Sequence, residues 1–168
     1  MLILRSIFFI LLLPGTVTVL IPYWLISSSN VGRFSKYHEL SYLGLPLIVI
    51  GALGLLTCIW QFFSEGRGTL APVDPPKHLV ARGLYRYVRN PMYVSVVTIL
   101  IGEAIFFMST RVLIEAGVFI GLAYLFVVIY EEPVLRRQFG ESYERYLLTV
   151  GRWIPRSPRN TYFTDDTK

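Results

Sequence analysis

Charged residues are scarce in this sequence. Asp, Glu, Lys and Arg make up 16% of its 168 residues, against about 25% in an average soluble domain. Hydrophobic residues make up 54%, and the mean hydropathy is +0.53, so water is not the main solvent expected for the chain. Because the few charges are clustered and leave long uncharged stretches, disorder, a coiled coil and most soluble folds are excluded.

Cysteine is almost absent as well. Cys58 is the only one in the chain and falls within an uncharged stretch, which excludes a disulfide framework and a cysteine zinc site. No Gly-x-Gly-x-x-Gly motif follows a potential strand, so a soluble dinucleotide-binding domain is not expected. No internal repeat or low-complexity run is visible either.

Four stretches are long and apolar enough to be transmembrane helices, which need about 20 apolar residues to cross about 30 Å of hydrocarbon. Residues 6–32 and 40–64 contain no charged residue, and residues 91–110 and 112–130 contain one glutamate each. We expect the first stretch to be retained rather than cleaved as a signal peptide, because its apolar residues continue to Ile26 without a small-residue cleavage site. The sequence therefore predicts an all-α integral membrane protein with about four transmembrane helices.

The distribution of Lys and Arg predicts the orientation of these helices, because the cytoplasmic side normally holds the excess. With four spans, Arg33, Lys36 and Arg111 fall on one side and every other Lys and Arg falls on the opposite side. A multi-pass protein with both termini and the long middle loop in the cytoplasm is therefore expected. Orientation and anionic lipid headgroups account for the net charge of +5, so membrane lipids are expected partners and nucleic acid is not. No feature of the sequence indicates an oligomeric state.

The chain divides into two parts. Residues 1–63 are expected to form an N-terminal pair of transmembrane helices, and they contain no polar residue that indicates chemistry. Residues 64–168 are expected to form a loop, a C-terminal helical hairpin and a cytoplasmic tail. The loop is predicted over residues 64–77, which are rich in Gly and Pro.

A tight antiparallel hairpin is predicted because only residues 108–111 join the third and fourth spans. Its two open ends are residues 78–93 and the adjacent pair Glu131 and Glu132. These ends are expected to meet at the cytoplasmic membrane surface. A site there could receive a water-soluble cofactor from one side and a lipid from the other.

The start of the third span carries several polar residues. Asn90 and Pro91 are expected to begin the helix, because Asn is a preferred N-cap and Pro is favoured at the first helical position. Arg86 and Arg89, flanked by tyrosines, fit either an interfacial basic and aromatic belt or a binding site. The acidic pair favours a site, since two carboxylates at a helix C-terminus, which repels negative charge, need cationic partners. A structural salt-bridge cluster is the alternative interpretation.

Residues 133–150 have apolar side chains at spacings of three or four, which predicts an interfacial amphipathic helix. Such a helix could cover the open end of the hairpin. A plain anchor at the membrane surface would show the same pattern.

Several motifs follow one another in this half of the chain. They are H-x4-GLYRYVRNPMY over residues 78–93, the acidic pair about forty residues later, FGESYERY over residues 139–146 and RWIP over residues 152–155. This order resembles the isoprenylcysteine carboxyl methyltransferase family and its relatives among the phospholipid methyltransferases. The resemblance covers roughly residues 78–155.

The resemblance implies an integral membrane methyltransferase that binds S-adenosylmethionine between the middle loop, which would be a cofactor-binding loop, and the end of the hairpin. No metal site is expected. The implied acceptor is lipophilic, an isoprenylcysteine carboxylate or a similar prenylated substrate. The positions that match the cofactor-site pattern of the family are His78, Gly83, Leu84, Tyr85, Arg89, Asn90, Pro91, Tyr93, Glu131 and Glu132. Arg89 and Glu132 are the predicted catalytic residues, with Arg89 nearest the transferred methyl group.

The chain departs from many relatives at two positions, with Asn90 where they have His and Ser95 where they have Gly. Asn does not titrate near neutral pH as His does, so a base at position 90 is not expected. A carboxylate acceptor needs no base, and Arg89 could orient it through paired hydrogen bonds. A phospholipid amine, the alternative acceptor, must first lose a proton, and Glu131 or Glu132 is the candidate base.

Two other functions stay open on the sequence. An NADPH-dependent membrane reductase is one, because sterol reductases resemble this family near the C-terminus, although the chain is short for one. A non-catalytic membrane scaffold is the other. Glu103, expected inside the bilayer, either lines a lipid tunnel or bonds to a neighbouring span. Glu115 is expected to pair with Arg111, four residues before it.

Overall fold

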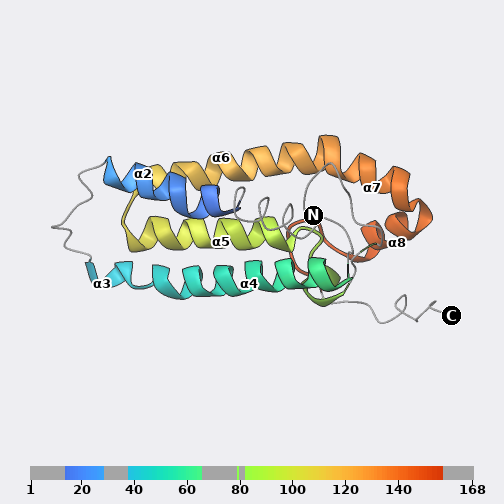
Figure 1. Ribbon diagram of the computed structural model, residues 1–168, viewed down its shortest axis with the longest axis horizontal. Coiled ribbons are helices and arrows are strands. Elements are labelled where there is room, and N and C mark those ends of the chain that lie inside the picture. The colour runs from blue at the N-terminus through green and yellow to red at the C-terminus, as the bar shows by residue number, and fades with distance from the viewer. Residues whose placement is uncertain (1–13, 29–37, 66–78, 80–81, 157–168) are drawn as a thin grey trace.

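The computed structural model describes residues 14–28, 38–65, 79 and 82–156, and every regular element within them is a helix or a helical turn (Figure 1). The predicted all-α fold is confirmed for this part of the chain. In order, the elements are the π-helical turn η1 (Thr16–Leu20), α2 (Ile21–Ser27), α3 (His38–Ser41), α4 (Gly44–Glu65), the 3-10 turn η2 (Gly83–Arg86), α5 (Pro91–Phe106), α6 (Thr110–Phe126), the π-helical turn η3 (Val127–Glu131), α7 (Glu132–Phe139) and α8 (Glu141–Thr149).

Two helical segments are long and apolar enough to cross a membrane. They are Glu39–Gln61 and Thr110–Phe139, the second of which contains α6, η3 and α7 in one continuous run. The other described apolar helices, Thr16–Ser27 and Pro91–Phe106, are shorter. The 16 residues of α5 cover about 24 Å, less than the hydrocarbon thickness, so the four-span prediction is confirmed for two helices only.

The predicted hairpin is present, and α5 and α6 run antiparallel on either side of a short turn (Figure 1). The helix α5 ends at Phe106, before the end of the predicted span over residues 91–110. It ends there because the backbone turns at Met108, which has a φ of 50°. Ser109 then caps α6, and its side chain accepts a hydrogen bond from the N–H of Val112 at 3.4 Å.

The helix α4 lies alongside α5, and glycines allow the two backbones to approach closely (Figure 1). A Cβ atom on Gly102 would lie 2.8 Å from the carbonyl oxygen of Gly44 and 2.8 Å from the backbone nitrogen of Ile48. A Cβ atom on Gly51 would lie 2.8 Å from the carbonyl oxygen of Ser95. Small residues at such crossings are typical of helix packing in membranes.

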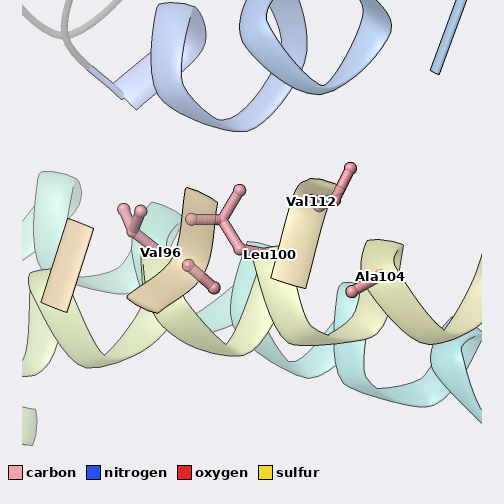
Figure 2. Packing of buried hydrophobic residues seen from close by; sticks show 5 residues of the cluster. Val96, Leu100, Ala104 and Val112 are labelled. Atoms are coloured by element: carbon pink, nitrogen blue, oxygen red, sulfur yellow. The ribbon is translucent and has the colours of Figure 1, made fainter. Parts of the chain in front are cut away.

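The main apolar core lies where α5 meets the beginning of α6. Val96, Leu100 and Ala104 recur every four residues along one face of α5 and pack with Val112 and Ala116 of α6 (Figure 2). Side chains of η1 and α2 cover this cluster, among them Val17. The N-terminal part of the chain therefore packs against the hairpin instead of standing apart from it.

Apolar side chains also cover the outer faces of α4 and α6. The most exposed are Leu45, Val49, Ile50, Leu53, Leu56 and Trp60 on α4 and Leu113, Ile114, Val118, Ile120, Leu122 and Leu125 on α6. A continuous apolar surface of this kind on a long helix suits contact with lipid.

The predicted single amphipathic helix over residues 133–150 is wrong in one respect, because the chain forms two short helices there. Gly140 has a φ of 51°, a left-handed conformation that ends α7 and redirects the chain into α8. Tyr143, Tyr146 and Val150 of this region are buried and pack with Leu135 of α7.

Glu115 does not form the ion pair expected for it. The pairing of Glu115 with Arg111 is wrong, because the guanidinium of Arg111 reaches across to Ser28 and donates to its carbonyl oxygen at 3.2 Å and its hydroxyl at 3.1 Å. Both carboxyl oxygens of Glu115, and Oε2 of Glu103 on the facing helix, are buried without a hydrogen-bond partner among the described residues.

Candidate functional site

A fixed turn precedes α5. Gly83 has a φ of 54°, a conformation that favours glycine, and a Cβ atom at this position would overlap the side chain of Gln61. The Oε1 atom of Gln61, near the end of α4, accepts a hydrogen bond from the N–H of Leu84 at 3.3 Å. The end of α4 thus fixes the turn η2, which carries Tyr85 and Arg86.

Residues 151–156, called the tail segment below, pair with the residues that lead into α5. The N–H of Arg89 donates to the carbonyl of Gly151 at 2.9 Å, and the N–H of Arg156 donates to the carbonyl of Tyr87 at 2.9 Å. Val88 and Gly151 form an isolated parallel bridge. The C-terminal end of the described chain therefore lies against the entry to the hairpin.

Asn90 contributes to this pairing through its side chain. It occupies the predicted N-cap position of α5, but its side chain makes no capping hydrogen bond. Its amide Nδ2 donates instead to the carbonyl oxygen of Arg152 at 3.1 Å, and the residue is buried. The side chain of Asn90 therefore binds the tail segment instead of capping α5 as expected.

Glu132 lies at the centre of an ion-pair cluster. Its Oε1 atom accepts hydrogen bonds from Nη1 of Arg89 at 3.0 Å and from Nε of Arg152 at 2.7 Å, and its Oε2 atom accepts one from Nη2 of Arg152 at 2.9 Å. The side chain of Glu132 is only 9% exposed. A carboxylate buried to this degree needs such compensation, and two guanidinium groups supply it.

Glu131 has a different environment, although it is the next residue. Its Oε2 atom accepts a hydrogen bond from the hydroxyl of Tyr93 at 3.2 Å. Within the described ranges no Lys or Arg forms an ion pair with it. The π-helical turn that ends at Glu131 widens the helix at this point, and such turns are frequent at functional sites. Adjacent carboxylates therefore have distinct partners, one cationic and one neutral.

Two buried donors near these carboxylates have no acceptor. The Nε atom of Arg89 and the Nε1 atom of Trp153 are both buried, and in the described part of the chain neither has a hydrogen-bond partner. The ring of Trp153 lies 6.2 Å from that of Tyr93, whose hydroxyl binds Glu131. Because unsatisfied buried donors are rare in folded proteins, their occurrence beside a carboxylate is typical of a site built for a polar ligand.

Two tyrosines of α8 connect it to the same region. The hydroxyl of Tyr146 donates to the carbonyl oxygen of Tyr85 at 2.7 Å. Burial raises the pKa of Tyr143 to about 12, with a further increase from the negative charge of Glu132 and a decrease from Arg89. Burial likewise raises the pKa of Tyr146 above its usual range. Both phenols are therefore neutral at physiological pH, and neither is a base.

Tyr146→Phe is expected to lower the free energy of unfolding by about 1–2 kcal/mol, because it leaves the part-buried carbonyl of Tyr85 without its partner. Thermal unfolding in detergent micelles measures the change. Tyr23→Phe is the matched control, since the side chain of Tyr23 is exposed. Equal stability of Tyr146→Phe and the wild type would contradict a docking role for this bond.

The structure brings most of the predicted site residues to one end of the hairpin. Arg89, Tyr93, Glu131 and Glu132 are connected by the contacts given above. Gly83, Leu84 and Tyr85 form the neighbouring turn, and Asn90 and Pro91 begin α5. His78 lies outside the described residues.

Three contributors were not predicted, namely Gln61, Arg152 and Trp153. Gln61 lies near the end of the uncharged stretch 40–64, in which no other polar residue indicated a site. Arg152 is one of several arginines near the C-terminus. The RWIP motif contains both Arg152 and Trp153 and was the available signal. It did not indicate which residue the arginine binds, because that depends on how the tail folds back.

Comparisons with known proteins give one match. The family model described as phospholipid methyltransferase matches residues 40–142, which is more than half of the chain. The matched range includes α4, the turn η2, the hairpin and both glutamates of the acidic pair. The comparison with curated proteins and the comparison with solved structures give no match.

Proposed function

The chain belongs to the phospholipid methyltransferase family, and we propose that it is an integral-membrane enzyme that transfers a methyl group from S-adenosylmethionine to a lipophilic acceptor. Membership of the family and the long apolar helices support a membrane methyltransferase. The observation that carries the finer proposal is the arrangement at the hairpin end. There Glu131 binds Tyr93, whose ring lies 6.2 Å from that of Trp153, and the buried Nε of Arg89 and Nε1 of Trp153 have no acceptor among the described residues. We place this end on the cytoplasmic side, because most Lys and Arg flank it.

The residues present fit S-adenosylmethionine. Its amino-acid part carries an ammonium and a carboxylate, and its adenosine part carries ribose hydroxyls and an aromatic base. Glu131 suits a cationic group, because no described Lys or Arg neutralises it. The buried donors of Arg89 and Trp153 suit an acceptor such as a carboxylate or hydroxyl oxygen.

The chemistry requires mainly positioning. When bound, S-adenosylmethionine supplies an electrophilic methyl group whose S–C bond breaks as the acceptor's lone pair forms the new bond, and the electron pair stays on the sulfur of S-adenosylhomocysteine. The protein contributes orientation of both partners and exclusion of water. Arg89 has a donor for an acceptor oxygen or the cofactor, and the half-buried rings of Tyr93 and Trp153 shield the site.

For an isoprenylcysteine carboxylate or a similar acid, the acceptor oxygens would bind Arg89 and need no base. A phospholipid amine is the second candidate acceptor, and a specific observation supports it. Such an amine must release a proton, and Glu131 can accept it, whereas three hydrogen bonds from two arginines already occupy the oxygens of Glu132. We therefore assign the role of candidate base to Glu131 rather than Glu132.

The test is a methyl-transfer assay with the full chain in lipid nanodiscs and S-adenosylmethionine labelled in its methyl group. One sample contains phosphatidylethanolamine, a second contains farnesylcysteine, and a third contains phosphatidylcholine alone. Transfer of label to the lipid phase in either of the first two samples, above the third, is expected and identifies the acceptor class.

Calorimetric titration with S-adenosylhomocysteine and, in parallel, with NADPH distinguishes the remaining functions. Saturable binding of S-adenosylhomocysteine, lost in Glu132→Gln, is the expected result. Binding of NADPH alone would assign the chain to a reductase, and binding of neither would favour a scaffold.

A further inference from the structure

We propose that Arg152 is a positioning residue for methyl transfer, because it occupies both carboxylate oxygens of Glu132 and thereby leaves the Nε donor of Arg89 available for a ligand. The inference rests on the proposed function. It concerns a residue outside the predicted site and outside residues 40–142, the range that the family model matches.

The two arginines bind Glu132 in different ways. Arg152 forms a bidentate pair, with Nε at 2.7 Å from Oε1 and Nη2 at 2.9 Å from Oε2. Arg89 forms a single hydrogen bond, from Nη1 to Oε1 at 3.0 Å. A bidentate pair is the strongest geometry between guanidinium and carboxylate, so Arg152 has the geometry that Arg89 would otherwise adopt.

The consequence for Arg89 is visible at its Nε donor. Its Nε atom is buried, and no described residue accepts a hydrogen bond from it. If Arg152 were absent, Arg89 could rotate to pair with both oxygens of Glu132, as guanidinium groups prefer. That rotation would withdraw from the site the donor that the proposed function uses.

The position of Arg152 is itself set by the fold. Asn90 binds its carbonyl oxygen at 3.1 Å, and the neighbouring Gly151 pairs with Arg89 through the backbone. Its guanidinium carbon also lies 5.9 Å from the ring centroid of Tyr124 on α6. Hydrogen bonding to Glu132 raises the pKa of Arg152 above its ordinary value. These contacts join the tail segment to the start of α5 through its backbone and to α6 through the side chain of Arg152.

The experiment measures kcat and the KM for S-adenosylmethionine in Arg152→Ala, with exogenous guanidinium as a chemical rescue. We expect kcat to fall by about tenfold to a hundredfold with little change in KM, because the displaced group orients the reaction. Guanidinium ion at low, non-denaturing concentration should restore part of kcat by pairing with Glu132. Methylammonium, which cannot bond both oxygens in a plane, should not. The side chain of Arg152 is 31% exposed, so the vacated position is open to a small cation.

Two further variants make the result decisive. Arg152→Lys keeps the charge but cannot form the bidentate pair. Its kcat should therefore be as low as that of Arg152→Ala, while its melting temperature should equal that of the wild type. This variant also provides the test if Arg152→Ala does not fold. Arg156→Ala, in the same tail segment and with an exposed side chain, should leave kcat unchanged.

Full activity of Arg152→Lys, unchanged kcat in Arg152→Ala, or equal rescue by both cations would overturn the proposal while leaving the proposed function intact. A wild-type protein without methyl transfer would instead remove the proposed function, and this inference with it.

Discussion

Arg89→Ala is expected to reduce methyl transfer by at least about a hundredfold, a loss comparable to removal of one preorganised donor in other active sites. The variant removes the Nη1 donor to Glu132 and the buried Nε donor at the same time. Glu132 keeps its bidentate partner Arg152, so the carboxylate is not left unpaired and the fold should persist. The labelled-methyl assay gives the rate, and thermal unfolding shows that the variant is folded.

Arg145→Ala is the matched control for this loss. Arg145 also forms an ion pair with a glutamate, Glu141, at 3.3 Å, but both side chains are exposed. Such a pair contributes little to stability, so activity and melting temperature should both remain near those of the wild type. Normal turnover of a folded Arg89→Ala protein would remove Arg89 from the site.

The sequence predicted the parts of the structure that depend on local pattern. The short connection over residues 108–111 required a hairpin, and the hairpin brings Arg89 to Glu132 although 43 positions separate them. Hydropathy identified the long helices but overestimated α5, because it does not detect the backbone turn at Met108. Phe107 and Met108 continue the apolar sequence past the last residue of α5, Phe106.

The parts that could not be predicted depend on side chains that reach between distant segments. Arg111 has a glutamate four positions later, yet it bonds to Ser28, the C-cap of α2, because the packing of α2 against α6 places that residue within reach. Arg152 binds Glu132 because Gly140 redirects the chain after α7. Neither preference can be read from spacing along one helix.

Asn90 lies at the predicted start of α5, but its side chain makes a different hydrogen bond from the one expected. The residue begins α5 as predicted, and Pro91 follows it at the first helical position. Burial against the tail segment draws its amide away from the helix and toward the carbonyl of Arg152. An amide at this position donates a hydrogen bond at any physiological pH, so the contact between hairpin and tail segment does not depend on titration.

Gly102→Ala is expected to lower the free energy of unfolding by about 1–3 kcal/mol, the usual cost of adding volume to a well-packed contact. The new methyl group would lie 2.8 Å from the backbone atoms of Gly44 and Ile48 on α4. Backbone atoms cannot turn aside as the end of a long side chain can, so α4 must move away from α5. Because Gln61 of α4 binds the turn η2, this movement should also weaken binding of S-adenosylhomocysteine.

Gly117→Ala provides the control for helix propensity. Gly117 lies on α6, and a Cβ atom there would meet nothing within 4 Å. Alanine favours a helix over glycine by about 1 kcal/mol, so this variant should be as stable as the wild type or more stable. Thermal unfolding of both variants in the same detergent gives the comparison. If Gly102→Ala were stabilised to the same extent, close approach of α4 and α5 could not be what fixes η2 beside the hairpin end. The turn would then have to depend on other contacts, such as the hydrogen bond from Tyr146 of α8 to Tyr85.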